Sequence, residues 1–375
     1  MPYDISEEKR EWYRKISARS RRRKVAAVNG ELQHNLGNVN IPALKPSRLM
    51  PYRKENGIRT LSLFSGGGGF DIGFERAGFE HIASFDILDI CGATLQRNRP
   101  QWDVFCGPQG DITQIDWSAY KGKVDFIHGG PPCQPFSVAG KQNGRDDERD
   151  MWPAFIDAVL TLLPDTFVAE NVPGLLDPKF QKYVNEVILS PLTPHYHIIK
   201  FKAIASDFGV PQVRKRVIFV GFRSPKAANY YQIPEPTHLP VDNLFTSGRH
   251  TLGVRAALGL DDIGFDCFAP TLRSGFTGPR KSTSILNSKA SQLVWEKLQI
   301  WPNGVQKSRE KARLFPPENG HFRLSVQDCA IIQGFPEDWF FEGAAYQILG
   351  QIGNSVCPPM GYAIAKSVSR ALGVV

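Results

Sequence analysis

An apolar run that ends in two glycines and two prolines constrains this fold most strongly. The run Val124 to Ile127 predicts a short buried strand. Gly129 and Gly130 follow it, and Pro131-Pro132 then prevent the continuation of a helix or a strand ladder. Cys133 is therefore expected on a stiff loop beyond the carboxyl end of a strand, where open α/β sheets bind ligands. A lone cysteine is more often a small buried hydrophobe, but this loop offers its side chain no apolar face.

A strand, a glycine loop and a helix precede this feature. Residues 58–64 are apolar and predict a strand, Ser65 to Phe70 form the glycine-rich loop, and residues 71–78 have helical apolar spacing. Such a loop lets a ligand approach the backbone and the helix N-terminus, although a merely flexible loop is the alternative. Asp71 stands where the dinucleotide fingerprint has its third glycine, and the missing Gly-Lys-Ser/Thr excludes a P-loop.

Acidic residues end the next two predicted units. Residues 81–87 predict a strand, and Asp86 follows Gly66 at the offset typical of a carboxylate that binds ribose hydroxyls. This spacing fits either an adenine dinucleotide or S-adenosylmethionine. Asp111 with Ile112 ends the following αβ unit. Asp111 could contact the adenine, or it could be an ordinary surface-turn residue. Together these units predict an α/β fold with a doubly wound, Rossmann-like sheet and a second, smaller irregular domain.

A carboxylate and two arginines complete the polar set. Residues 166–172 predict a buried strand that contains Glu170 near its end, where an acid is costly unless it is paired or functional. Gln212, Arg214 and Arg216 alternate, so their side chains share one face if the segment is extended. Three hydrogen-bond donors on one face could bind a phosphate or the edge of a base. Alternatively, they are only the solvent-exposed beginning of a strand.

Charge and cysteine usage narrow the class of protein. Residues 1–58 carry 13 Lys and Arg against 6 Asp and Glu, and residues 212–321 carry 16 against 8. Two basic zones favour a polyanion that contacts both, with a solvated tail as the alternative. The six cysteines are scattered and indicate neither a zinc site nor disulfides, so no metal is expected. The lack of a long apolar run or a signal region predicts a cytoplasmic protein.

Eight motifs, in order, resemble those of the C5-cytosine-specific DNA methyltransferases of prokaryotic restriction-modification systems. Pro131-Pro-Cys-Gln-Pro-Phe-Ser137 resembles their catalytic loop. The other motifs are Leu63 to Phe70, Asp86, Asp111 with Ile112, Glu170 to Val172, Gln212-x-Arg214-x-Arg216, Arg323 to Pro336, and Gly353 to Val356. At two positions the chain departs from the family, since Ser62 replaces its common Asp and Asp86 its commoner Glu.

The resemblance implies a DNA (cytosine-5-)-methyltransferase that uses S-adenosylmethionine, yields S-adenosylhomocysteine and flips its target cytosine out of the duplex. Cys133 would add to C6 of the base, Glu170 would bond N3, and Arg214 and Arg216 would favour the thiolate. Cofactor contacts are expected from Phe64, Ser65, Gly66, Gly68, Asp86, Asp111, Ile112, Pro132, Trp152, Asn354, Ser355 and Val356. DNA contacts are expected from Gln134, Ser137, Gln212, Thr271, Leu272, Arg273, Arg280 and Lys281.

The resemblance also divides the chain. Residues 1–57 are expected to be a basic N-terminal extension, helical to about Val28 and then a linker, which adds non-specific DNA affinity. Residues 58–222 are the catalytic and cofactor-binding domain, 223–338 the target-recognition domain, and 339–375 a segment that returns to the catalytic domain. We expect a monomer without membrane contact, acting on double-stranded DNA beside a cognate restriction endonuclease.

Other functions remain open on the sequence. The first is an RNA (tRNA) cytosine-5 methyltransferase with the same motifs. Such enzymes carry a Cys-Phe-Thr signature, which Cys267-Phe268-Ala269 matches only in part. The second is a silent DNA-binding relative, although Cys133 and Glu170 are intact. An NAD-dependent dehydrogenase lacks the third glycine of its loop and leaves the Pro-Pro-Cys-Gln motif unexplained.

Overall fold

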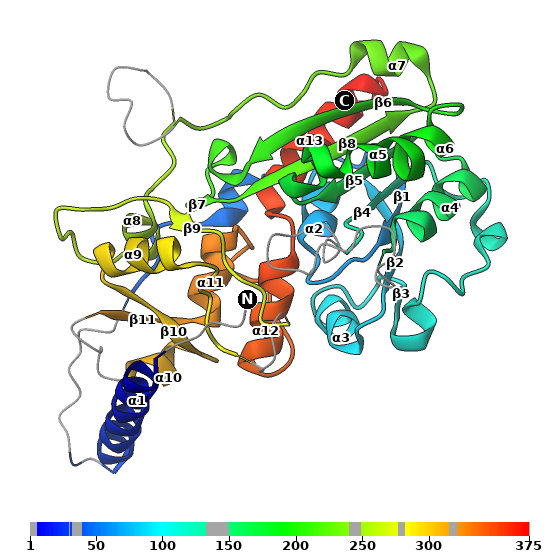
Figure 1. Ribbon diagram of the computed structural model, residues 1–375. Helices are drawn as coiled ribbons and strands as arrows, with labels where there is room; N and C mark the ends of the chain where they lie inside the picture. Colours follow the sequence, from blue (N-terminus) through cyan, green and yellow to red (C-terminus); the bar gives the residue numbers. More distant parts are fainter. Residues whose placement is uncertain are drawn as a thin grey trace.

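A central sheet of seven strands organises the computed structural model (Figure 1). The structure describes residues 6–29, 31, 40–132, 150–239, 249–276, 282–314 and 321–374. The strands lie in the order β3-β2-β1-β4-β5-β8-β6. Their bounds are β1 Arg59–Leu63, β2 Glu80–Asp86, β3 Val104–Cys106, β4 Phe126–Gly129, β5 Thr166–Asn171, β6 His197–Ile204 and β8 Lys215–Phe222.

The strand order creates a switch point between β1 and β4. The neighbouring pairs from β3 to β5 are parallel, whereas β8 runs antiparallel to both β5 and β6. The chain leaves β1 toward β2 and β3 and later returns to place β4 on the other side of β1. Because open α/β sheets bind ligands where the strand order reverses, the loops after β1 and β4 adjoin the expected site.

Apolar side chains cover both faces of the sheet, as parallel strands require. Phe126 and Val168 join one core cluster, while their neighbours Ile127 and Phe167 join the other. Helices α2 (Gly69–Arg76) and α13 (Pro358–Ala371) pack together on the first face. Helix α4 (Trp152–Leu162) belongs to the second cluster. This two-sided core confirms the doubly wound α/β fold.

Apart from the first helix, the remaining elements are short. The other helices are α1 Glu7–Val28, α3 Asp89–Asn98, α5 Gln181–Tyr183, α6 Ser190–Leu192, α7 Pro225–Tyr230, α8 Val254–Leu258, α9 Lys289–Lys297, α10 Arg309–Arg313, α11 Val326–Gln333 and α12 Ala345–Asn354. A π-helix, Val184–Leu189, joins α5 to α6. Short 3-10 helices span Pro46–Leu49, Gly107–Gly110, Trp117–Tyr120, Pro173–Leu176, Pro178–Phe180 and Ala205–Phe208.

The region after β8 is irregular, as predicted, but its strands form two small sheets, one of them with β7, which precedes β8. β7 (Gln212–Val213) pairs with β9 (Ala269–Pro270), and β10 (Ile300–Gln306) pairs with β11 (Phe322–Ser325). Figure 1 shows α9, α10, β10 and β11 gathered at one end of the molecule, beside the large sheet. The sequence pattern did not reveal β10, because its proline and glycine break the apolar alternation.

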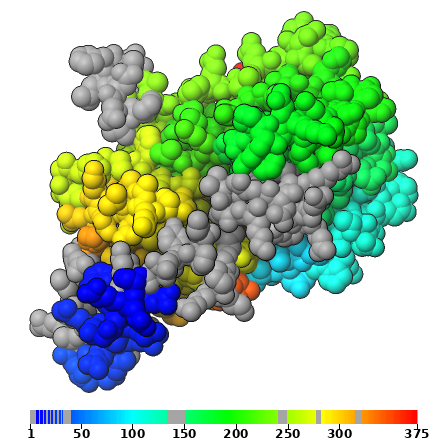
Figure 2. Space-filling model, viewed as in Figure 1, coloured from blue at the N-terminus to red at the C-terminus, as the bar shows by residue number. Residues whose placement is uncertain are grey.

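The N-terminal segment has two parts. Helix α1 ends at Val28, as expected, and stands at the outer edge of the molecule (Figure 2). From residue 40 the chain packs on the body: Met50 is fully buried, and the Tyr362 hydroxyl donates to the carbonyl oxygen of Pro51 at 2.8 Å. Residues 40–57 therefore contact the core within the expected linker. Within the described ranges, no helix is long and apolar enough to cross a membrane.

Candidate active site

The glycine loop after β1 is held closely by the C-terminal part of the chain. A Cβ on Gly69 would lie 2.2 Å from the carbonyl oxygen of Val356, and Gly68 has φ +84° with Trp339 beneath it. The indole N–H of Trp339 donates to the carbonyl oxygen of Gly67 at 3.1 Å. Larger residues would force these segments apart, so the glycines are required by close packing as well as by backbone conformation.

The segment Asn354 to Val356 adjoins this loop. A Cβ on Gly67 would lie 3.1 Å from the Ser355 hydroxyl oxygen. Ser355 and Val356 are buried, and Asn354 is exposed. The structure thus brings together two motifs that lie almost three hundred residues apart. Sequence reasoning assigned no role to Trp339, since nothing local in the sequence signals a contact of such separation.

Asp86 ends β2 beside the glycine loop. Its carboxylate accepts hydrogen bonds from the backbone N–H of Gly66 at 2.8 Å and of Leu88 at 2.9 Å. Burial raises its pKa, and these hydrogen bonds oppose that shift. A carboxylate has about four lone-pair sites, so it retains capacity to accept further hydroxyl donors. The next residue, Ile87, is 57% exposed and presents an apolar surface that sequence reasoning missed.

Three other residues that were expected to contact the cofactor have side chains that are less accessible to a ligand. The Asp111 carboxylate accepts from both the N–H and the hydroxyl of Thr113, which closes a local turn. Ile112 is 4% exposed. Trp152 is fully buried and packs edge-to-face against Phe219. In the structure Trp152 therefore lies within the core, and its expected cofactor contact stays a prediction.

Glu170 and Arg216 form a largely buried ion pair at the carboxyl end of β5. Arg216 Nε lies 2.5 Å from Glu170 Oε1. Burial raises the pKa of the Glu170 carboxyl, while the charges of Arg216 and Arg214 lower it. A Cβ on Gly130 would lie 3.0 Å from Glu170 Oε2, so the carboxylate faces the start of the loop that leads to Cys133. The site thus pairs an acid with a guanidinium out of water.

Asn171 connects this pair to the same loop. Its side-chain amide donates to the carbonyl oxygen of Pro131 at 3.1 Å. Sequence reasoning quoted Asn171 within a motif but gave it no role. Pro132, an expected cofactor contact, is half-buried. The expected residues Cys133, Gln134, Ser137, Arg280 and Lys281 lie outside the described residues.

The predicted common face of Gln212, Arg214 and Arg216 is confirmed. Gln212 and Arg214 are fully buried, whereas the intervening Val213 is 44% exposed. Arg214 Nη2 donates to the carbonyl oxygen of Gly353 at 2.8 Å, which joins β7 and β8 to the C-terminal segment.

Gln212 and Leu272 make contacts inside the protein, and their expected DNA contacts stay predictions. The Gln212 amide nitrogen donates to Gln333 Oε1 at 2.8 Å, and its oxygen accepts the N–H of Leu272. Leu272 itself is 2% exposed. Both side chains are used inside the protein, where they attach the irregular region to the catalytic sheet. Thr271 and Arg273, on the same segment, are half-buried, and the Thr271 hydroxyl donates to the carbonyl oxygen of Val213.

A model of the family described as C-5 cytosine-specific DNA methylase matches residues 58–253 and 271–370. The type II methyltransferase M.NgoMIV of Neisseria gonorrhoeae is 34% identical over 332 residues, which cover 84% of this chain and 97% of that protein. The type II methyltransferase M.NaeI of Lentzea aerocolonigenes is 30% identical over 329 residues, covering 84% and 76%.

Solved structures show the same fold. A putative DNA modification methyltransferase from an E. coli prophage has a TM-score of 0.56 at 24% identity and covers 84% of this chain and all of its own. A Spodoptera frugiperda DNMT2 variant has a TM-score of 0.57 at 19% identity, covering 83% and 99%. The family match and the type II relatives favour a DNA substrate over the tRNA alternative. The chain therefore belongs to the C-5 cytosine-specific DNA methylase family and is a DNA cytosine methyltransferase.

Proposed function

We propose that this enzyme transfers a methyl group from S-adenosylmethionine to C5 of a flipped-out cytosine in duplex DNA, through a covalent bond between Cys133 and C6. The observation that carries the proposal is the Glu170–Arg216 pair, whose carboxylate lies beside Gly130, three residues before Cys133. An acid, its partner cation and a thiol on an adjoining loop are the groups that this addition chemistry requires.

The residues at the carboxyl edge fit an adenosyl group. Asp86 retains acceptor capacity for two ribose hydroxyls, and the exposed Ile87 offers an apolar surface for an adenine ring. The glycine loop with Phe64, Ser65, Gly66 and Gly68 would hold the remainder from one side, and Asn354 to Val356 from the other. Bound S-adenosylmethionine supplies an electrophilic methyl group carried on a sulfonium.

Cys133 would activate the base. Cytosine C5 is a poor nucleophile, and addition of a thiolate to C6 moves the C5–C6 electron pair toward C5 as an enamine. A free cysteine with pKa about 8.5 is only slightly ionised at neutral pH, so the cationic Arg214 and Arg216 would favour the thiolate. After C5 carries the methyl group, loss of its proton restores the double bond and expels Cys133.

Glu170 would assist by holding a proton at N3. Burial raises its pKa, which favours the protonated form that donates to N3 when the thiolate adds. Arg216 would keep the carboxyl oriented by donating a hydrogen bond to it. A positioned proton donor of this kind typically contributes about 10²–10⁴-fold in rate.

DNA binding would use both basic zones. Flipping a base costs a few kcal/mol, which phosphate contacts offset. Candidates are Thr271, Arg273, Arg280 and Lys281 in the recognition region, with Gln134 and Ser137 on the catalytic loop. We further propose that the enzyme acts as a monomer in the cytoplasm and protects DNA from a cognate restriction endonuclease.

A mechanism-based trap tests the covalent step. Duplex DNA with 5-fluorocytosine at the target lets Cys133 add and the methyl group transfer, but fluorine cannot leave as a cation, so elimination stops. We expect a denaturation-resistant protein–DNA adduct with wild type and none with Cys133→Ser. Methyl transfer to DNA without any adduct would contradict the covalent mechanism, and an adduct with fluorocytosine in tRNA instead of DNA would favour the RNA alternative.

A further inference from the structure

A row of buried polar side chains crosses three central strands beneath helix α2. Ser84 on β2 pairs in register with Ser62 on β1, and Ser62 with His128 on β4. Their side chains are at most 1% exposed. They lie on the face that α2 covers, because their neighbours Leu61 and Ile127 belong to the opposite core cluster. Parallel strands are normally apolar on both faces, so this polar row needs a partner.

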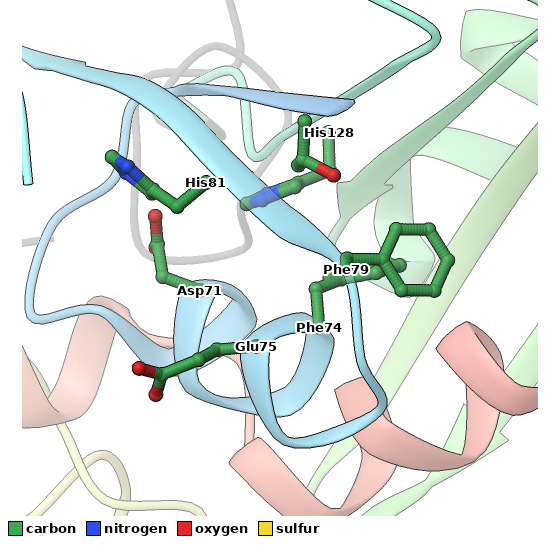
Figure 3. Close-up of a pocket in the computed structure, with 7 residues that line it drawn as sticks. Asp71, Phe74, Glu75, Phe79, His81 and His128 are labelled. Atoms are coloured by element: carbon green, nitrogen blue, oxygen red, sulfur yellow. The ribbon is translucent and has the colours of Figure 1, made fainter. Parts of the chain in front are cut away.

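Asp71 in the first turn of α2 is that partner. The Ser84 hydroxyl donates to Asp71 Oδ1 at 3.1 Å, and His81 Nε2 lies 2.7 Å from the same hydroxyl. Asp71 Oδ2 is buried without a hydrogen-bond partner among the described residues. Figure 3 shows the Asp71 carboxyl directed from α2 toward His81. Both side chains line a cavity of about 10 Å³. Sequence reasoning had noted Asp71 as the residue in place of a third glycine, without assigning it a role.

Ser62 connects this cluster to the glycine loop, because it is in register with Ser84 and its hydroxyl lowers the pKa of Asp71. The Ser62 hydroxyl lies 2.8 Å from that of Ser65, and the N–H and hydroxyl of Ser65 both donate to the carbonyl oxygen of Phe85. Between the two serines, Phe64 has φ +56°, a left-handed conformation that costs about 1–2 kcal/mol for an L-residue. Contacts on both sides of Phe64 therefore hold a strained turn at the start of the loop.

We propose that Asp71 is a positioning residue for the methyl donor: through Ser62 and Ser84 it fixes Ser65 and the strained Phe64 turn in the conformation that binds S-adenosylmethionine. The inference rests on the proposed function and deepens it. Asp71 lies beneath the loop and acts through Ser62 and Ser65, so its removal lowers donor affinity more than the rate at saturating donor.

The surroundings of Asp71 make this support dependent on pH. Burial raises the pKa of Asp71 to about 6, and the nearby Glu75 also raises it, whereas the Ser62 and Ser84 hydroxyls lower it. Burial lowers the pKa of His81 to about 4 and that of His128 to about 3. Both imidazoles are therefore neutral while Asp71 ionises, and the serine hydroxyls stabilise its charge. Donor affinity is expected to rise as pH increases through 6.

Calorimetric binding of S-adenosylhomocysteine to the full-length enzyme tests the inference without catalysis. Asp71→Asn and Asp71→Ser should each weaken binding about tenfold, the effect of removing one hydrogen bond to a charged group. The exchanged double variant Ser62→Asp with Asp71→Ser returns a carboxylate to the cluster and should recover most of the affinity. Asp207→Asn, which changes a half-buried aspartate elsewhere, is the matched control.

Two further readouts separate positioning from a merely structural role. Asp71→Asn should raise the KM for the donor while leaving kcat within a few-fold, and its affinity should change less than that of the wild type between pH 5 and pH 7. Ser65→Ala, which cuts the link to the loop and leaves Asp71 in place, should weaken binding similarly. Wild-type affinity in both Asp71→Asn and Ser65→Ala would overturn the inference alone. Failure of the wild type to bind the ligand at all would overturn the proposed function, and the inference with it.

Discussion

The side-chain amide of Asn171 donates a hydrogen bond to the carbonyl oxygen of Pro131 at 3.1 Å. Asn171 is the last residue of β5 and follows Glu170 directly, whereas Pro131 precedes Cys133 by two residues. This bond ties together the two segments whose side chains are proposed to act on one cytosine. We therefore expect this buried amide, which takes no part in the proposed chemistry, to help position the acid relative to the thiol.

Asn171→Ala should lower kcat by about tenfold to a hundredfold, because a shift of about 1 Å between reacting groups has effects of this order. The buried Pro131 carbonyl would also lose its partner, at a cost of about 1–3 kcal/mol in the free energy of unfolding. Single-turnover methylation and denaturant unfolding measure the two effects. Asn56→Ala removes a part-buried amide that bonds Ala77 and Ser369, and it should reduce stability without changing the rate. Equal kcat in both variants would contradict the positioning role.

The Glu170–Arg216 pair predicts a pH effect. The charge of Arg216 lowers the pKa of Glu170, so Arg216→Met should raise that pKa further above its burial-elevated value. If protonated Glu170 donates to N3, activity declines as pH rises through this pKa, and the decline should occur at higher pH in Arg216→Met. Arg216→Lys keeps the positive charge, so the decline in activity should occur near the same pH as in the wild type. Single-turnover rates across pH 5 to 10 measure this decline. A decline at the wild-type pH in Arg216→Met would refute the effect of Arg216 on the pKa of Glu170.

Trp339 should control the glycine loop from the far end of the chain. Trp339→Phe keeps most of the ring packing beneath Gly68 but removes the hydrogen bond to Gly67, so S-adenosylhomocysteine should bind several-fold more weakly. The unfolding free energy should fall by about 1 kcal/mol. Trp301→Phe, in the irregular region, is the control. Unchanged ligand affinity in Trp339→Phe would show that the hydrogen bond does not shape the loop.

Local sequence patterns predicted the strands that carry the site. The runs ending near Asp86 and Glu170 are bounded by turn residues, and β2 and β5 end at or within a residue of their expected limits. The alternation of Gln212 with Arg214 gave the correct face, since the side-chain period of a strand depends only on local geometry. β4 is displaced by two residues from the predicted 124–127, because its pairing with Thr60 to Leu63 sets the register.

Long-range contacts could not be predicted in this way. Trp339 and Gly67 meet because the C-terminal segment returns to the sheet, and no local pattern records this return. The Gln212 side chain likewise forms a hydrogen bond inside the protein, to Gln333 in a helix that is distant in the sequence. Asp71 was visible as a departure from a glycine pattern, but its role needs the register of three strands. Motifs therefore identified which residues matter, and packing decided what several of them do.

The basic helix α1 should add non-specific DNA affinity. Because residues 40–57 pack on the core, the informative deletion removes residues 1–39 rather than the whole extension. The plot of log affinity against log salt should become shallower by about 0.9 for each phosphate that the shortened protein no longer neutralises. Replacing Arg21 to Lys24 with glutamine should also make this plot shallower. Replacing Lys121 and Lys123 with glutamine should leave its slope unchanged. An unchanged slope after deletion would refute this role.

The most direct test of the central claim is transfer of a labelled methyl group from S-adenosylmethionine to duplex DNA, with base-resolution mapping. Wild type should place the label at C5 of cytosine within one short sequence motif. Cys133→Ser should abolish transfer while retaining DNA binding. Label in RNA alone, or undiminished transfer by Cys133→Ser, would contradict the account.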